Sequence, residues 1–212
     1  MEPSGAPVHG PYEFHLSDAE RAQAVATLRR HGLPDGRPII VLHPGANWPH
    51  KRWPPERFAA LANRLAEREA VALVVTGSPA DDPLVRALCQ DLRHQPVILA
   101  GRTSLRELAA SLEQAAVVVA NDTGVLHVAV ALGRPVVALY GPTSPTLTGP
   151  LGDPRRIVVI HHLDCCPSIP CYHPDHPDRP GMRAIAVDEV YEATRQLLQG
   201  QGAGDVGRGR RP

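Results

Sequence analysis

The segment AVVVANDTGVLHVAVALGRPVVALY, residues 116–140, carries the clearest pattern in the chain. It begins with the short apolar run Ala116–Asn121 and ends with a second one, Pro135–Tyr140. Between them, Gly124–Leu132 is a run of small and apolar residues with the length of a short helix. Continuous apolar runs are typical of strands that are covered on both faces. A strand, a helix and a strand of this size predict two parallel strands joined by a right-handed crossover.

The same alternation continues outward in both directions. Further strands are predicted at Ile39–His43, Val71–Thr76 and Val97–Ala100, with a weaker one at Ile157–Ile160. Further helices are predicted at Ser17–Gly32, Pro55–Glu69, Asp81–Leu92, Ser104–Leu112 and Val187–Gln199. Two of these helices begin with a capping box, Ser17 with Glu20 and Ser104 with Glu107. The sequence therefore predicts an α/β fold with a doubly wound, Rossmann-like parallel sheet.

The chain of 212 residues is long enough for one globular domain. Residues 1–16 are rich in Pro and Gly and are expected to form a flexible segment. Residues 17–199 form the predicted domain, and residues 200–212, rich in Gly and Arg, are expected to be a disordered tail.

Composition excludes several classes of function. The 22 basic and 22 acidic residues give a formal net charge of +0, so we expect no nucleic acid partner. No apolar run approaches the roughly 20 residues of a membrane helix, and the first residues lack the features of a signal peptide. A cytoplasmic protein, with at most peripheral membrane association, is expected. Lys51 is the single lysine among the basic residues, which favours a specific role for its compact ammonium group.

Ligands of open α/β sheets bind beyond the carboxyl ends of the strands, and three loops there carry chemistry. The first runs from His43 to Pro54. In it, Gly45 allows the backbone to approach a ligand closely, and Lys51 and Arg52 come just before a helix. Cations near a helix N-terminus suit phosphate. A proline-stiffened loop with two surface cations and two packing tryptophans is the alternative.

The second loop is Asn121–His127, where the amides of Thr123 and Gly124 begin a helix and favour an anion. Asp122 would repel a phosphate, so it is expected to cap the helix or to accept hydrogen bonds from sugar hydroxyls. His127 lies one turn into the helix and faces either the ligand or the core.

The third loop, Tyr140–Pro145, is a small rigid segment that brings amides and the Thr143 hydroxyl toward a phosphate, or is only a proline turn. The sequence contains no Walker loop, no GxGxxG after the first strand and no GxSxG elbow. These absences weigh against a P-loop nucleotidase, a simple dinucleotide enzyme and a serine hydrolase.

In their order and spacing, these loops resemble glycosyltransferase family 9, the ADP-heptose:lipopolysaccharide heptosyltransferases. The matching segments are His43-Pro44-Gly45-Ala46, Lys51-Arg52-Trp53-Pro54, Thr76-Gly77-Ser78, Leu99–Leu105, Asn121–Ala129 and Leu139–Thr143. The resemblance covers about Ser17 to Gln199 and implies the C-terminal, donor-binding half of a GT-B glycosyltransferase. An inverting transfer from a nucleotide sugar, with ADP-heptose as the expected donor and a lipopolysaccharide core as acceptor, is implied.

The resemblance also implies roles for individual residues. Lys51 would stabilise charge on the departing diphosphate, and no metal or other cofactor is expected because Lys51 and helix-end amides replace the divalent ion. Substrate-binding positions are implied at Gly45, Ala46, Lys51, Asp81, Asp122, Thr123, Gly124, His127 and Thr143. Among these, Asp81 is the candidate for the ribose. The general base and the acceptor platform are expected in an N-terminal domain that the sequence does not match.

Two questions stay open at this point. Cys165, Cys166 and Cys171, followed by His173 and His176, have an irregular spacing that fits either a metal site or a plain loop. The chain acts either as a heptosyltransferase that needs its acceptor domain, or as a stand-alone nucleotide-sugar-binding module or inactive half without turnover.

Overall fold

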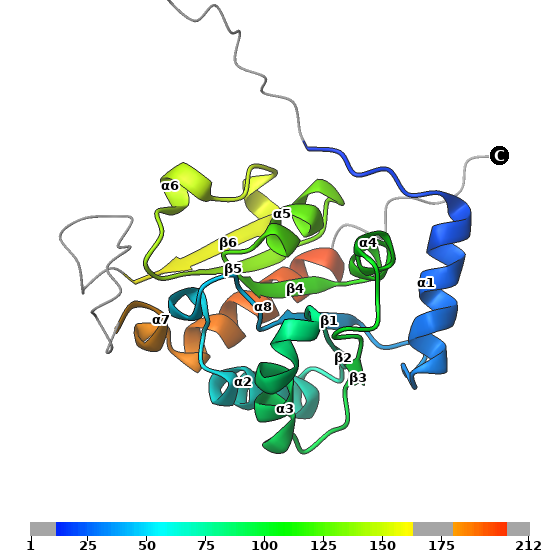
Figure 1. Ribbon diagram of the computed structural model, residues 1–212, viewed down its shortest axis with the longest axis horizontal. Coiled ribbons are helices and arrows are strands. Elements are labelled where there is room, and N and C mark those ends of the chain that lie inside the picture. The colour runs from blue at the N-terminus through cyan, green and yellow to red at the C-terminus, as the bar shows by residue number, and fades with distance from the viewer. Residues whose placement is uncertain (1–11, 163–179, 203–212) are drawn as a thin grey trace, which may run out of the picture.

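The computed structural model describes residues 12–162 and 180–202, which form a single sheet with helices on both faces (Figure 1). Six strands pair in the order β3-β2-β1-β4-β5-β6, and every pair is parallel. The strands are β1 (Ile39–His43), β2 (Ala72–Val75), β3 (Val97–Ile98), β4 (Val117–Asn121), β5 (Val136–Tyr140) and β6 (Ile157–His161). The predicted doubly wound α/β fold is confirmed.

Each predicted helix is present, and the structure adds several short elements that begin with proline. The helices are α1 (Asp18–Arg30), α2 (Pro55–Arg68), α3 (Asp82–Gln90), α4 (Leu105–Glu113), α5 (Gly124–Ala131), α6 (Pro145–Thr148), α7 (Pro180–Ala184) and α8 (Val187–Gly202). The 3₁₀ turns are η1 (Pro49–Lys51), η2 (Pro79–Asp81) and η3 (Pro154–Arg156). Within the described ranges, no helix is both long and apolar enough to cross a membrane.

The strands β1, β2, β4 and β5 are buried on both faces, which explains why they are continuously apolar, whereas the edge strand β6 is partly exposed. Ile40 and Leu42 of β1 pack into the core beneath α2, α3 and α8, whereas Val41 between them packs beneath α4 and α5. Figure 1 shows α8 and α2 on one side of the sheet and α4 and α5 on the other. Successive side chains of a strand point to opposite faces, so a strand covered on both faces needs an apolar residue at every position.

The direction of winding reverses between β1 and β4, the two central strands. Ile40 of β1 is paired with Leu73 of β2 on one side and with Val117 of β4 on the other. The chain leaves β1 toward α2 on one face and leaves β4 toward α5 on the opposite face. A reversal of this kind separates two successive loops at the carboxyl ends of the strands, which is where ligands bind in such sheets.

The end of α5 shows how the sequence stops a helix next to a strand. Gly133 has a φ of +68°, its amide donates to the Val130 carbonyl, and the next amide, of Arg134, donates to the Ala129 carbonyl. A left-handed residue with these two bonds closes the last turn, and glycine adopts that conformation without steric cost. Pro135 and β5 follow at once.

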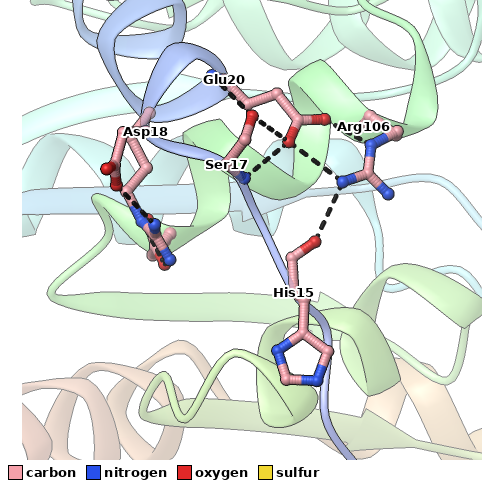
Figure 2. A network of polar contacts seen from close by, with 7 residues as sticks. His15, Ser17, Asp18, Glu20 and Arg106 are labelled. Carbon is pink, nitrogen blue, oxygen red and sulfur yellow. Dashed lines mark hydrogen bonds and ion pairs between the residues drawn. The ribbon is translucent and has the colours of Figure 1, made fainter.

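The helix α1 is fixed to α4 through polar contacts at its N-terminus (Figure 2). Ser17 and Glu20 form the predicted capping box, and the Glu20 carboxylate also binds the Arg106 guanidinium of α4. The Arg106 Nη2 donates to the His15 carbonyl at 2.9 Å. Leu16 is buried, so the expected flexible segment ends before it, because His15 and Leu16 are held against the domain.

Replacing Arg106 with Ala is expected to lower the urea midpoint of unfolding at neutral pH, and this effect should diminish as the pH falls. Arg106 and Ser17 lower the pKa of Glu20 from 4.5 to about 2. A carboxylate with a lowered pKa stabilises the fold above its unfolded pKa and loses that contribution as the pH falls toward its folded pKa. The difference between variant and wild type should therefore shrink between pH 4.5 and about 2. Urea denaturation across that interval measures it.

The exposed pair Arg86–Asp82 on α3 provides the control for that measurement. Arg86→Ala removes a guanidinium without loosening a contact between two helices, so its effect at neutral pH should be smaller. An Arg106→Ala variant no less stable than Arg86→Ala at neutral pH would contradict the role given to the α1–α4 contact.

The ends of the chain and the Cys-rich segment bear on three predictions. The helix α8 continues to Gly202, so the expected domain boundary after residue 199 falls within a helix. Cys165, Cys166, Cys171, His173 and His176 lie outside the described residues, as do residues 1–11 and 203–212.

Candidate functional site

An ion pair joins the loops that follow β1 and β4, at the point where the winding reverses. The Lys51 Nζ lies 2.6 Å from Oδ2 of Asp122, and the Thr143 hydroxyl donates to the same oxygen at 2.6 Å. The side chains of Lys51 and Asp122 are 19% and 6% exposed. Three predicted site residues from the three predicted loops therefore meet at one carboxylate oxygen.

The loop after β1 is held in place by Asn121, the last residue of β4. Its Nδ2 donates to the Pro44 carbonyl at 2.9 Å, and its Oδ1 accepts from the Trp53 amide at 3.1 Å. The Asn121 side chain is buried, and a buried amide of this kind fixes both ends of the loop that carries Lys51. Asn121 lies in the second predicted loop, but the residue pattern predicts no role for it.

Trp53 anchors the far end of that loop in the core. Its ring lies edge-on to Phe58, with centroids 4.9 Å apart, and its Nε1 donates to the Ile185 carbonyl at 3.0 Å. A buried Trp whose N–H is satisfied is a rigid anchor, so Lys51 sits on a short turn between two fixed points. The interpretation of a loop with two packing tryptophans is thus half right, since Trp53 packs fully whereas Trp48 does not.

The N-terminus of α5 is open to solvent at Gly124. A Cβ added there would meet nothing within 4 Å, so the first amides of the helix have room for a ligand. Thr123, not Asp122, is the N-cap residue, and its side chain makes no capping hydrogen bond. The expectation that Asp122 caps the helix is therefore wrong: its carboxylate turns away to bind Lys51 and Thr143.

Gly45 and Asp81 are packed against each other. The Asp81 carboxylate accepts from the Ser78 amide at 2.8 Å and the Ser78 hydroxyl at 2.7 Å. A Cβ on Gly45 would lie 2.6 Å from the same Oδ2 of Asp81. Gly45 is thus needed to admit Asp81, in addition to any approach of a ligand. The Arg52 guanidinium, which donates to the Ala46 carbonyl at 3.0 Å, lies 3.9 Å from the other Asp81 oxygen.

Two buried groups near these loops are held neutral. Burial lowers the pKa of His43 to about 4, and its Nδ1 lies 3.0 Å from the Thr76 hydroxyl. Burial and the nearby Asp122 carboxylate raise the pKa of Tyr140, whose hydroxyl donates to the Thr148 carbonyl at 2.8 Å. Neither group carries charge at neutral pH, and the permanent positive charges of the loop after β1 are those of Lys51 and Arg52.

The remaining predicted residues differ in position. Ala46 is buried beside Arg52, and Thr143 is buried with its hydroxyl committed to Asp122. His127 is half-buried on α5, and its ring forms no hydrogen bond with the residues that the structure describes.

Shape alone does not mark these strand ends. A shallow cavity of about 130 Å³ lies at the amino ends of the strands, between α1 and the start of β1, and is lined by Val25, Leu28 and Leu33 among others. We place the candidate site by chemistry, because the strand ends combine cations, helix amides and buried carboxylates. Across residues 12–162 and 180–202, no cluster of three or more His, Cys, Asp or Glu side chains is arranged to hold a metal ion.

Comparisons with known proteins identify the family of the chain. The family model for glycosyltransferase family 9 (heptosyltransferase) matches residues 2–173. The chain is 40% identical to lipooligosaccharide heptosyltransferase 2 of Haemophilus influenzae over 158 residues, which are 72% of this chain and 45% of that protein. It is 36% identical to lipopolysaccharide heptosyltransferase 2 of Escherichia coli over 151 residues, 69% of this chain and 42% of the relative.

A solved structure, that of the E. coli ADP-heptose lipopolysaccharide heptosyltransferase II, superimposes with a TM-score of 0.75 at 31% identity. The superposition covers 90% of this chain and 54% of that one. The chain thus spans about half the length of the relatives that it matches.

Proposed function

The chain belongs to glycosyltransferase family 9 (heptosyltransferase), and from that premise we propose that it binds the nucleotide sugar of a heptosyl transfer, with ADP-heptose as the donor. The acceptor in this proposal is a lipopolysaccharide core, held by a separate N-terminal domain. The observation that carries the proposal is the Lys51–Asp122–Thr143 contact, which gathers three loops at the reversal of the sheet.

The contact supports a diphosphate site because it orients Lys51 without using all of its donors. An ammonium group has three N–H donors, and one of them serves Asp122 at 2.6 Å. The other two remain for phosphate oxygens, and the open N-terminus of α5 at Gly124 adds backbone amides. Positive charge held in this way would stabilise the diphosphate as it leaves the sugar, which is the role of a divalent ion in other enzymes.

We assign the ribose and the transferred sugar, at the two ends of the donor, to the two buried carboxylates of the strand ends. Asp81 follows β2 and is proposed to lie by the ribose, while Asp122 follows β4 and is proposed to lie by the sugar that is transferred. In both cases one carboxylate oxygen is already engaged, Oδ2 of Asp81 by Ser78 and Oδ2 of Asp122 by Lys51 and Thr143. A second oxygen on each carboxylate is the acceptor that a sugar hydroxyl needs.

The same engagement favours a second candidate, a nucleotide-sugar-binding module without turnover. A carboxylate that neutralises Lys51 is a poor general base, and Asp81 is fixed by Ser78. The described part of the chain therefore supports donor binding better than acceptor activation. The two candidates differ in one requirement: the transferase needs a separate acceptor domain that supplies the base, whereas the binding module does not.

ADP is expected to bind this chain in the presence of EDTA, with a dissociation constant on the order of 0.1–1 mM. The affinity is expected to be weak because the proposed contacts come from one side of the nucleotide only. Isothermal calorimetry or NMR titration of the 212-residue chain measures it. Adenosine, which lacks the diphosphate, should bind more weakly.

A titration with excess Mg²⁺ in place of EDTA is the matched control. Equal affinities in the two buffers are expected if Lys51 and the α5 amides do the work of a metal ion. The proposal fails if neither ADP nor UDP binds at several-millimolar concentrations, and its metal-independent form fails if binding requires Mg²⁺.

A further inference from the structure

Trp48 is an exposed aromatic residue on the same turn as Lys51. It is 42% exposed, whereas Trp53 at the other end of the turn is fully buried. The Lys51 Nζ lies 5.4 Å from the centroid of the Trp48 ring. A cation within about 6 Å of an indole face is attracted to it, so the ammonium group that binds Asp122 also helps to orient the ring.

The backbone at Trp48 is also restricted. Trp48 has an extended conformation, with φ −116° and ψ 135°, and Pro49 begins η1 directly after it. Proline fixes its own φ and confines the residue before it to extended conformations. An exposed Trp on a stiff turn loses little freedom when a ligand covers it, which makes it suitable as a contact surface.

The turn has two sides, and the ring of Trp48 lies by Lys51, whose ammonium group reaches the end of β4. Lys51 reaches Asp122 at the end of β4, whereas Arg52 turns the other way, to the Ala46 carbonyl and toward Asp81 after β2. The ring of Trp48 lies by the Lys51 ammonium, and hence on the side where the transferred sugar is proposed to lie. The nucleoside is proposed on the other side, near Asp81.

We propose that Trp48 is a specificity-determining contact for the transferred sugar, with its indole face covering the C–H face of that sugar. The inference rests on the proposed function, since it needs the diphosphate at Lys51. The face of an aromatic ring carries negative charge and the C–H groups of a sugar ring carry small positive charge, so the two surfaces attract while the hydroxyls stay free for Asp122. Sugar is thereby recognised by one apolar and one polar contact from neighbouring strand ends.

The experiment compares ADP-heptose with ADP on the 212-residue chain and three variants. Trp48→Ala should weaken ADP-heptose binding about three- to tenfold, the range of an aromatic contact, and leave ADP binding unchanged. Trp48→Phe keeps an aromatic face and should retain most of the affinity. Trp48→Leu keeps an apolar side chain without a ring and should behave like Trp48→Ala.

Fluorescence gives a second readout, because one tryptophan is exposed and the other buried. ADP-heptose should change the emission of wild type more than ADP does, and Trp48→Phe, which retains only Trp53, should lose that extra change. The emission of Trp53 in the same variant also reports whether the core is intact.

Three results would overturn the inference. Equal weakening of ADP and ADP-heptose by Trp48→Ala would mean that the ring acts only through Lys51. Unchanged binding of both ligands would mean that the ring touches neither. Failure of ADP to bind the wild-type chain would refute the proposed function, and the inference with it; that outcome is distinguished by the wild-type ADP titration alone.

Discussion

The 212-residue chain, saturated with ADP-heptose, is expected to transfer no detectable heptose to a lipopolysaccharide-core acceptor. A general base contributes about 10²–10⁴-fold to such a reaction, and positioning of the acceptor contributes more. At the strand ends that the structure describes, Asp122 is bound to Lys51, Asp81 is bound to Ser78, and His43 is buried. We therefore expect none of these three groups to take a proton from an acceptor hydroxyl. A radiolabel or mass-spectrometric transfer assay measures the result.

The positive control adds the N-terminal domain of a family member in trans. The relatives are about twice as long as the matched part of this chain, and the acceptor platform and the base are expected in the other half. Partial recovery of transfer is expected if α1, which is fixed to α4 by Arg106, re-forms contacts with that domain. Transfer by the 212-residue chain alone would contradict the proposal, and Asp122→Asn and His127→Ala would then be the first variants to assay.

Lys51→Ala is expected to weaken ADP binding by about 1.5–3 kcal/mol, the range of a hydrogen bond to a charged group. Two effects add in this variant. The diphosphate loses its cation, and the Asp122 carboxylate, only 6% exposed, loses the partner that neutralises it and so repels the phosphates. Lys51→Arg should restore part of the affinity, because a planar guanidinium does not reproduce the position of a compact ammonium. Calorimetric titration with ADP measures all three proteins.

The double variant Lys51→Ala, Asp122→Asn separates the two effects. The double variant removes the repulsion between residue 122 and the phosphates but does not restore the contact that Lys51 made with them. Its affinity for ADP should therefore lie between those of Lys51→Ala and wild type. Adenosine binding should be the same in every variant, since adenosine carries no phosphate. Wild-type ADP affinity in Lys51→Ala would show that the lysine is only a surface charge paired with Asp122.

The helices and strands could be predicted from the sequence because each is marked by a pattern within a short stretch of residues. The apolar runs at Ile39–His43 and Val117–Asn121 are buried on both faces, and the pairs Ser17–Glu20 and Ser104–Glu107 form capping boxes where the spacing predicts them. Elements such as α6 escaped prediction because four residues that begin with proline carry no periodicity. The order of the strands depends on pairings between distant segments, for which no local rule exists.

The candidate site could be predicted only as a set of loops. The residue types at Lys51, Asp122 and Thr143 indicated their chemistry, but the sharing of one carboxylate oxygen depends on three strand ends that lie far apart in the chain. Asp122 was expected either to cap α5 or to accept hydrogen bonds from sugar hydroxyls. The first role is not seen, because its carboxylate binds the Lys51 ammonium group and the Thr143 hydroxyl and not the helix amides. The role of Asn121 in holding Pro44 and Trp53 has no counterpart in any local pattern.

The pairing of β1 with β4 also constrains the route by which the chain folds. Lys51 and Asp122 are separated by 71 residues, and Asn121 lies 77 residues from the Pro44 carbonyl that it binds. Contacts at such separations form only after a long loop closes, and folds that depend on them assemble slowly. The α2–α3 half and the α4–α5 half of the sheet can each gain local structure first, but neither half contains all the residues proposed to contact the donor. Because the proposed donor contacts of Lys51 and Asp122 come from different halves of the sheet, donor binding is expected only after the two halves have docked, and it would report that step.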